Sequence, residues 1–121
     1  MLRKTSGSMK MAQSKTHKRL SAFMAAWQWR LGLQLWDITL IIGDGPKGAH
    51  GSCLWDLKTM KATIKINKNK KMKEATIIHE LLHLMLAEFT PKDGTAKYDR
   101  LEDVVATLEA NLYNLAYGGD K

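Results

Sequence analysis

The segment His79-Glu80-Leu81-Leu82-His83 constrains this chain more than any other part of its sequence. Its two histidines are four residues apart, so on an α-helix they lie one above the other and both imidazoles can reach the same metal ion. At about 100° per residue, His83 lies about 40° and Glu80 about 100° around the helix from His79. The apolar residues of the same segment fall between about 200° and 300°. The sequence therefore predicts a helix with a metal-binding stripe on one side and a core-facing surface on the other.

Zinc is the metal that this HExxH pattern favours. Two histidine nitrogens bind Zn²⁺, and a catalytic site leaves one coordination position to a water molecule. Glu80 stands next to the first histidine, where its carboxylate can accept a proton from that water as a general base. We therefore expect one zinc ion, with His79 and His83 as ligands and Glu80 as the catalytic residue.

The third ligand must be a carboxylate if it follows the motif. The other two histidines, His17 and His50, both precede it, and Leu86 and Phe89 occupy the positions at which an extended motif has glycine and a third histidine.

Two glutamates in the following helical segment are the best candidates. Glu102 and Glu109 are seven residues apart on one stripe, which is about 10 Å of helix, so only one of them can bind the same ion. Asp99 is a weaker candidate, and Glu88 is expected to point away from the histidines. The residues alone leave the choice between Glu102 and Glu109 open.

The hydrophobic periodicity predicts one α+β domain with a helix, a small three-stranded sheet and two further helices. The expected elements are a helix over 19–33, strands over 36–42, 52–56 and 61–67, a helix over 73–89 and a helix over 97–117. The apolar residues expected to enter the core from the first helix are Leu20, Phe23, Met24, Trp27 and Leu31. Those expected from the last helix are Leu101, Val104, Val105, Leu108, Leu112 and Leu115.

The strand over 61–67 alternates lysine and threonine with apolar residues. We expect it to be an edge strand, because charged side chains discourage pairing with other chains. From Lys58 to Lys73 there are seven lysines and no acidic residue, which would favour an acidic peptide beside it.

The chain has 121 residues and a net charge of +7, and the excess charge is concentrated near the N-terminus. Residues 1–30 contain no acidic residue and seven basic ones, which are Arg3, Lys4, Lys10, Lys15, Lys18, Arg19 and Arg30. We expect residues 1–18 to be a basic disordered tail and residues 19–121 to form the single domain. Because the remainder of the chain is neutral overall, we do not expect nucleic acid as a partner.

The composition also bears on the compartment. A single cysteine, Cys53, cannot form an internal disulfide and is expected to be a small buried side chain. The sequence has no apolar run of the roughly 18 residues that a membrane span needs. We expect a cytoplasmic monomer without a membrane partner.

The sequence resembles the minimal gluzincins, small zinc metallopeptidases of prokaryotes and their phages. The similarity covers about 100 residues and is carried by the segments ATIKIN, IIHELLHLML and LEDVVATLEANL between Ala62 and Leu115. In that family the third ligand is a glutamate in a segment similar to E-x-V-V-x-x-L, which Glu102 matches here. The resemblance implies a zincin-like fold with an active-site helix and a C-terminal ligand helix.

The resemblance also implies a substrate and its binding strand. Zincins bind an extended peptide along an edge strand above the active-site helix, which assigns Ala62, Ile64 and Ile66 to substrate binding. The implied activity is zinc-dependent hydrolysis of peptide bonds in a peptide or protein. An oxyanion-stabilising donor is also needed, and Tyr98, Tyr113 or His50 are candidates.

Two alternatives accompany this interpretation. The segment Glu109-Ala110-Asn111 is similar to the EAN segment of the ImmA/IrrE-like peptidases, which act on repressors of mobile elements or stress genes, and it makes Glu109 the second choice for the third ligand. This chain has HELLH where that family has HELGH, and Tyr113 where it has a Phe-Ala pair. The other alternative is a non-catalytic zinc domain whose basic tail docks on a protein or nucleic acid.

Overall fold

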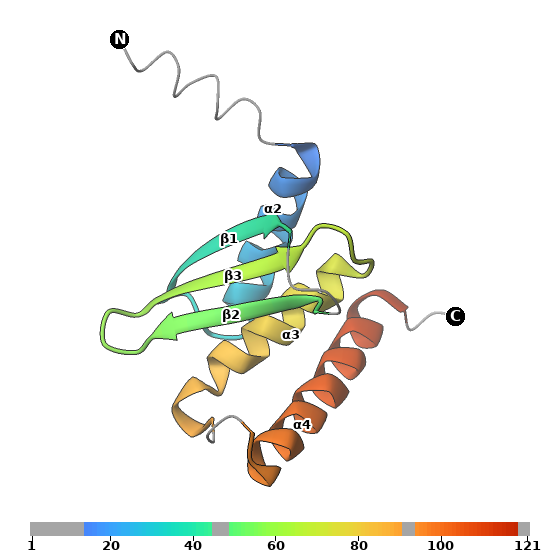
Figure 1. The fold of residues 1–121 in the computed structure, drawn as a ribbon. Helices are drawn as coiled ribbons and strands as arrows, with labels where there is room; N and C mark the ends of the chain where they lie inside the picture. Colours follow the sequence, from blue (N-terminus) through green and yellow to red (C-terminus); the bar gives the residue numbers. More distant parts are fainter. Residues whose placement is uncertain (1–13, 45–48, 91–93, 119–121) are drawn as a thin grey trace.

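The protein is described from a computed structural model, which covers residues 14–44, 49–90 and 94–118. These residues form three α-helices and a mixed three-stranded sheet, which confirms the α+β class (Figure 1). In chain order the elements are α2 (Lys15–Arg30), β1 (Asp37–Gly43), β2 (Gly51–Asp56), β3 (Lys61–Asn67), α3 (Lys73–Met85), a 3₁₀ turn (Ala87–Phe89), α4 (Ala96–Tyr113) and a π-helical turn (Asn114–Gly118). None of the described helices is long and apolar enough to cross a membrane.

Helix α2 begins four residues before the predicted start at Arg19. The Ser14 hydroxyl caps the helix by accepting a hydrogen bond from the backbone N–H of His17, at 3.0 Å. The His17 ring then donates from Nε2 to the carbonyl oxygen of Leu40 on β1, at 3.1 Å. Residues 15–18 are therefore helical and, with the cap Ser14, belong to the domain. Residues 1–13 of the predicted tail lie outside the described residues.

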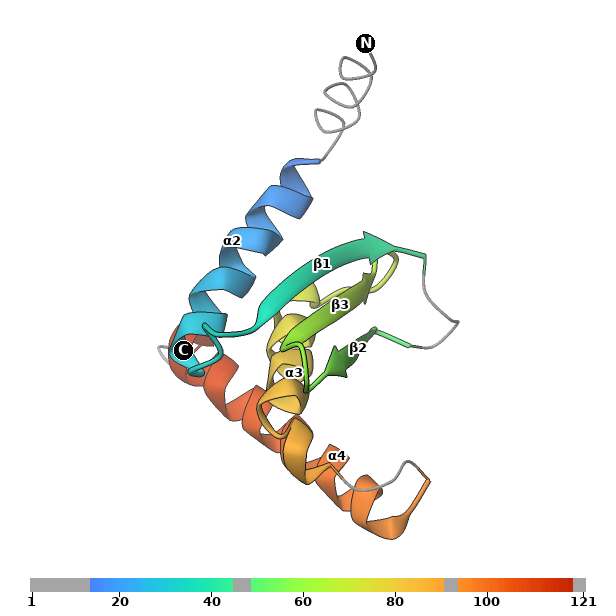
Figure 2. The same ribbon diagram turned by 90° about the vertical axis from the view of Figure 1, so that its left-hand side faces the viewer.

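The core face of α2 agrees with the sequence prediction. Leu20, Met24 and Trp27 are buried, and Phe23 and Leu31 are half-buried against them. Spacings of three and four residues place these side chains along one side of the helix. Figures 1 and 2 show that this side and α3 cover the same face of the sheet.

The strand order is β1-β3-β2, with β1 parallel and β2 antiparallel to β3. The expectation that the strand over 61–67 lies at an edge is therefore wrong, because β3 is the central strand. Its residues Ala62, Ile64 and Ile66 are at most 5% exposed and face the core, where they are inaccessible to a substrate. Alternation shows which side chains share a face of a strand, and it carries no information on how many neighbours the strand has.

The lysines of β3 project from the opposite, solvent-facing side of the sheet. Lys61 is in register with Asp37 of β1 and Asp56 of β2, so it stands between two carboxylates across three strands. Charges on this face keep the uncovered side of the sheet hydrated. They do not mark an edge, and the edges are β1 and β2.

Helix α4 buries less than its sequence predicts. Val105 is fully buried and Leu101 and Leu112 are half-buried, but Val104 is 49% and Leu115 is 81% exposed. Leu108, which was also expected in the core, is 36% exposed. The reason is that α4 packs on α3 and contacts little else, so a narrow apolar stripe covers the whole contact.

The central place of β3 predicts the effect of two substitutions on the free energy of unfolding. Ile64→Ala removes side-chain atoms from a fully buried position, which costs about 2–5 kcal/mol. Leu54→Ala on β2 is the matched control, because Leu54 is 73% exposed and its loss costs less than about 0.5 kcal/mol. Urea unfolding followed by circular dichroism measures both values, and equal losses would contradict the burial of β3.

Candidate metal centre

The two motif histidines lie side by side on α3, as the four-residue spacing predicts. Their ring centroids are 5.0 Å apart and the rings are tilted by 58°. His83 is buried and His79 is partly exposed at the rim of a cavity. The opposite side of α3, with Ile77, Ile78 and Leu81, is fully buried in the core. The orientation of the helix is thus fixed by its apolar face, and this turns the polar stripe toward α4 and β2.

Glu102 reaches both histidines from α4. Its Oε1 atom lies 3.3 Å from Nε2 of His79 and 3.2 Å from Nε2 of His83. One ligand atom from each of the three residues lies within 4.8 Å of the others, so the cluster could hold a metal ion. Two imidazole nitrogens and one carboxylate oxygen form a donor set that suits Zn²⁺.

Tyr98 holds the Glu102 carboxylate from the other side. Its hydroxyl donates to Oε2 of Glu102 at 3.0 Å, one helical turn away on α4. Burial opposes ionisation of Glu102, but the nearby His83 and the hydrogen bond from Tyr98 outweigh it, and the pKa of Glu102 is lowered. The carboxylate is therefore ionised at neutral pH, as a metal ligand must be. The sequence analysis named Tyr98 as a candidate oxyanion donor. In the structure its hydroxyl is hydrogen-bonded to Glu102, a candidate metal ligand.

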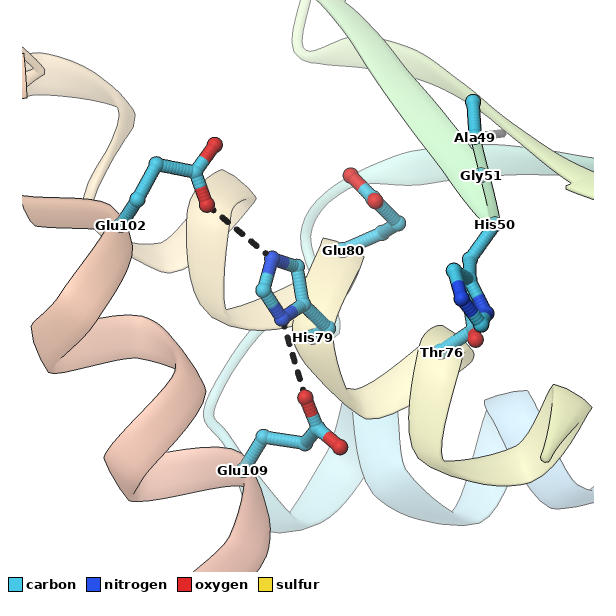
Figure 3. Close-up of a pocket in the computed structure, with 8 residues that line it drawn as sticks. All are labelled: Ala49, His50, Gly51, Thr76, His79, Glu80, Glu102 and Glu109. Carbon is cyan, nitrogen blue, oxygen red and sulfur yellow. Dashed lines mark hydrogen bonds and ion pairs between the residues drawn. The ribbon is translucent and has the colours of Figure 1, made fainter. Parts of the chain in front are cut away.

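Glu109 takes a different position from the one that the sequence suggested. Its Oε1 atom lies 3.0 Å from Nδ1 of His79, on the side of the ring that faces away from Glu102 (Figure 3). A carboxylate at this position accepts a hydrogen bond from the Nδ1–H group and so keeps the proton on Nδ1. Nε2 of His79 is then left with a lone pair directed at Glu102 and His83. Glu102 and Glu109 are seven residues apart on one stripe of the helix, and from the sequence this spacing served only to exclude a second ligand. The same spacing could have predicted that Glu109 contacts the other nitrogen of His79.

Glu80 lies beside His79 in one cavity (Figure 3) and lines a second cavity together with His83. It is 7% exposed, and burial raises its pKa to about 7, with His79 opposing the shift and Glu102 and Glu109 adding to it. A carboxyl group with this pKa can both accept and release a proton near neutral pH.

Two adjoining cavities of about 380 and 210 Å³ open on this cluster. Gly51 on β2 lines both, as do Glu80 and Glu102. A side chain at Gly51 would place its Cβ 2.8 Å from the carbonyl oxygen of Lys65 and 2.9 Å from Cγ2 of Thr76. Glycine therefore lets the edge strand β2 pass close to α3 along the cleft, a requirement that no pattern in the sequence predicts.

The remaining predicted residues are placed as follows. His50 lines the larger cavity. Tyr113 packs against Tyr117, with ring centroids 5.0 Å apart and the rings tilted by 51°, and it lines neither of the two cavities. Asp99 and Glu88 take no part in the metal-binding cluster found among the described residues.

A scan against protein-family models and searches of curated proteins and of solved structures found no match to this chain. The account of the site therefore depends on its own geometry.

The geometry predicts different effects of the two glutamates of α4 on zinc binding. Glu102→Ala removes a candidate ligand and should abolish stoichiometric zinc. Glu109→Ala should keep one ion per chain but weaken zinc affinity about 10–100-fold, and Glu109→Gln, whose amide oxygen can still accept from His79, should weaken it less. Competition with a chelating dye measures the affinities.

Asp103→Ala is the matched control for that experiment, because Asp103 is an exposed acidic residue on the same helix. It should leave the zinc affinity unchanged. Loss of zinc in Glu109→Ala together with full retention in Glu102→Ala would contradict the arrangement.

Cys53 provides an independent test of the cleft. Its side chain is half-buried on β2 in the smaller cavity, and burial, together with the charge of Glu80, raises the pKa of the thiol to about 12. Since the thiolate is the reactive form, native Cys53 should react with iodoacetamide at pH 8 about a hundredfold or more slowly than in urea. Mass spectrometry follows this single site, and equal rates would show that the strand is not packed as described.

Proposed function

We propose that the protein is a zinc-dependent peptide hydrolase with a zincin-like site. The observation that carries the proposal is the convergence of His79, His83 and Glu102 within 4.8 Å, next to a buried glutamate in an open cleft. This supports the ligand set that the resemblance to minimal gluzincins implies. His79, His83 and Glu102 would hold the ion through two nitrogens and one oxygen.

The number of protein ligands favours catalysis over a structural role. A structural zinc site usually has four protein ligands, whereas a catalytic site has three and keeps a position for water. Among the described residues the cluster contains three. When bound, zinc supplies a Lewis acid that polarises the scissile carbonyl and lowers the pKa of a water molecule.

Glu80 performs the proton transfer in this proposal. It accepts a proton from the attacking water and later donates one to the leaving amine, and it lies beside the proposed ligands His79 and Glu102 in the cleft. Glu109 keeps His79 in the tautomer that presents Nε2, and Tyr98 holds the Glu102 carboxylate through its Oε2 atom. These two residues position the groups that contact the ion.

The substrate would bind along β2 instead of β3. Like β1, β2 pairs on one side only among the described strands. Its residues Gly51, Ser52, Cys53 and Trp55 line the cleft beside Glu80. An extended peptide can add to such an edge through main-chain hydrogen bonds, which require no particular side chain. Binding of this type fits a small domain with few specificity pockets.

A substitution of Glu80 tests the proposal. Glu80→Gln removes the general base but none of the candidate ligands, so it should keep one zinc ion per chain and lower peptide cleavage by about 10²–10⁴-fold. Zinc content is measured by mass spectrometry of the metal, and cleavage is measured on a proteome-derived peptide library. Glu74→Gln is the control, because Glu74 is near the start of the same helix and outside the cleft.

The outcome distinguishes the two functional classes. A wild-type protein that binds zinc but cleaves no peptide in the library, with Glu80→Gln indistinguishable from it, would favour a non-catalytic zinc domain.

A further inference from the structure

Two basic segments that are about 50 residues apart in sequence lie at the same end of the described structure. One is the first turn of α2, and the other is the turn from β3 into α3; both views of the fold show them near one another (Figures 1 and 2). We define the basic end by its six cationic side chains, which are Lys15, Lys18, Arg19, Lys68, Lys70 and Lys71. Five of these are exposed and Lys70 is half-buried.

Specific contacts hold the two segments together. Arg19 of α2 forms an ion pair with Glu74 in the first turn of α3. The ring of His17 donates to the carbonyl oxygen of Leu40, which fixes the start of α2 on β1. Since β1 pairs with β3 along its whole length, the basic end is a fixed feature of the fold and not a chance approach of two loops.

The positive charge of this end is only partly neutralised. Its two acidic neighbours among the described residues are Glu74, paired with Arg19, and Asp44, whose Oδ1 lies 3.4 Å from Nζ of Lys68. The Asp44 pair is largely exposed and contributes little. The first turn of α2 contains no acidic residue, so its lysines add to the positive end of the helix dipole.

We propose that the basic end binds the phosphate backbone of a nucleic acid. Lysine, serine, threonine and asparagine side chains together with helix N-termini are the groups that contact phosphates, and here Ser14, Thr16 and Asn69 are exposed among the lysines. The sequence alone led us to expect no such partner, because the chain beyond residue 30 is neutral overall. The two basic segments are separate along the chain. The fold joins them into one surface.

The surroundings of the basic end favour nucleic acid over an acidic protein. Protein interfaces are usually built around an apolar or aromatic centre. Among the described residues, the exposed large apolar side chains near this end are Met72 and Ile41, which follows Leu40 on β1. Others, such as Leu35, Phe89 and Leu115, are exposed on other parts of the molecule. The proposed contacts are made to phosphates, which carry no sequence information, so we expect binding that is independent of base sequence.

The N-terminal sequence adds to the same charge. Arg3, Lys4 and Lys10 precede Ser14, and no acidic residue lies between Met1 and Ser14. In the sequence these basic residues directly precede the segment that forms α2.

The test uses the full chain and a fluorescein-labelled DNA duplex of 20 base pairs, with binding followed by fluorescence anisotropy from 50 to 200 mM salt. A variant with Lys68→Gln, Lys70→Gln and Lys71→Gln should bind about tenfold or more weakly at 50 mM salt, and the slope of log affinity against log salt should fall by about 2 to 3. The control variant carries Lys58→Gln, Lys97→Gln and Arg100→Gln, which removes the same charge elsewhere. It should bind as the unchanged protein does.

Four results would overturn the proposal. They are no binding of the unchanged protein at 50 mM salt, equal weakening in both variants, no weakening in the first variant, or tighter binding of a 20-residue polyglutamate than of the duplex. The third result would show that the turn from β3 into α3 is not part of the binding surface, and the fourth would assign this end to acidic proteins. Circular dichroism confirms that both variants fold, which is expected since the altered side chains lie on the surface.

Discussion

The contact between the polar stripe of α3 and the helix α4 is the interaction on which the site depends. Glu80 and His83 are at most 7% exposed, and burying ionisable groups without partners costs several kcal/mol. The carboxylates of Glu102 and Glu109 supply partners to the histidine ring nitrogens, and no buried side-chain nitrogen or oxygen among the described residues lacks a hydrogen bond. The same contacts that make the helix pair stable therefore assemble the donor atoms.

Local patterns in the sequence predicted the parts of the fold that depend on local geometry. The apolar spacing of Leu20, Met24 and Trp27 predicted the buried face of α2, and the alternation over 61–67 predicted the bounds of β3. The four-residue spacing of His79 and His83 predicted their common direction. Each of these follows from the repeat of a helix or a strand, which is fixed by the backbone alone.

Features that depend on distant partners could not be predicted in this way. The central place of β3 is decided by β1 and β2, and an alternating strand looks the same with one neighbour or two. Leu108 and Leu115 have the spacing of core residues, yet α3 is too narrow a partner to cover them. The role of Glu109 depends on which face of His79 meets α4, which is a property of the helix pair and not of either segment.

The thin attachment of α4 has a consequence for how the site assembles. Val105 is its one fully buried side chain, and the far end of the helical segment is tied down by the hydrogen bond from Nε1 of Trp27 to the hydroxyl of Tyr117, at 2.9 Å. A helix held by so few contacts opens at a lower free energy than the core. An ion bound by the histidines of α3 and by Glu102 of α4 would cross-link the two helices. Ion binding would then stabilise the packing of α4 on α3, and loss of that packing would release the ion.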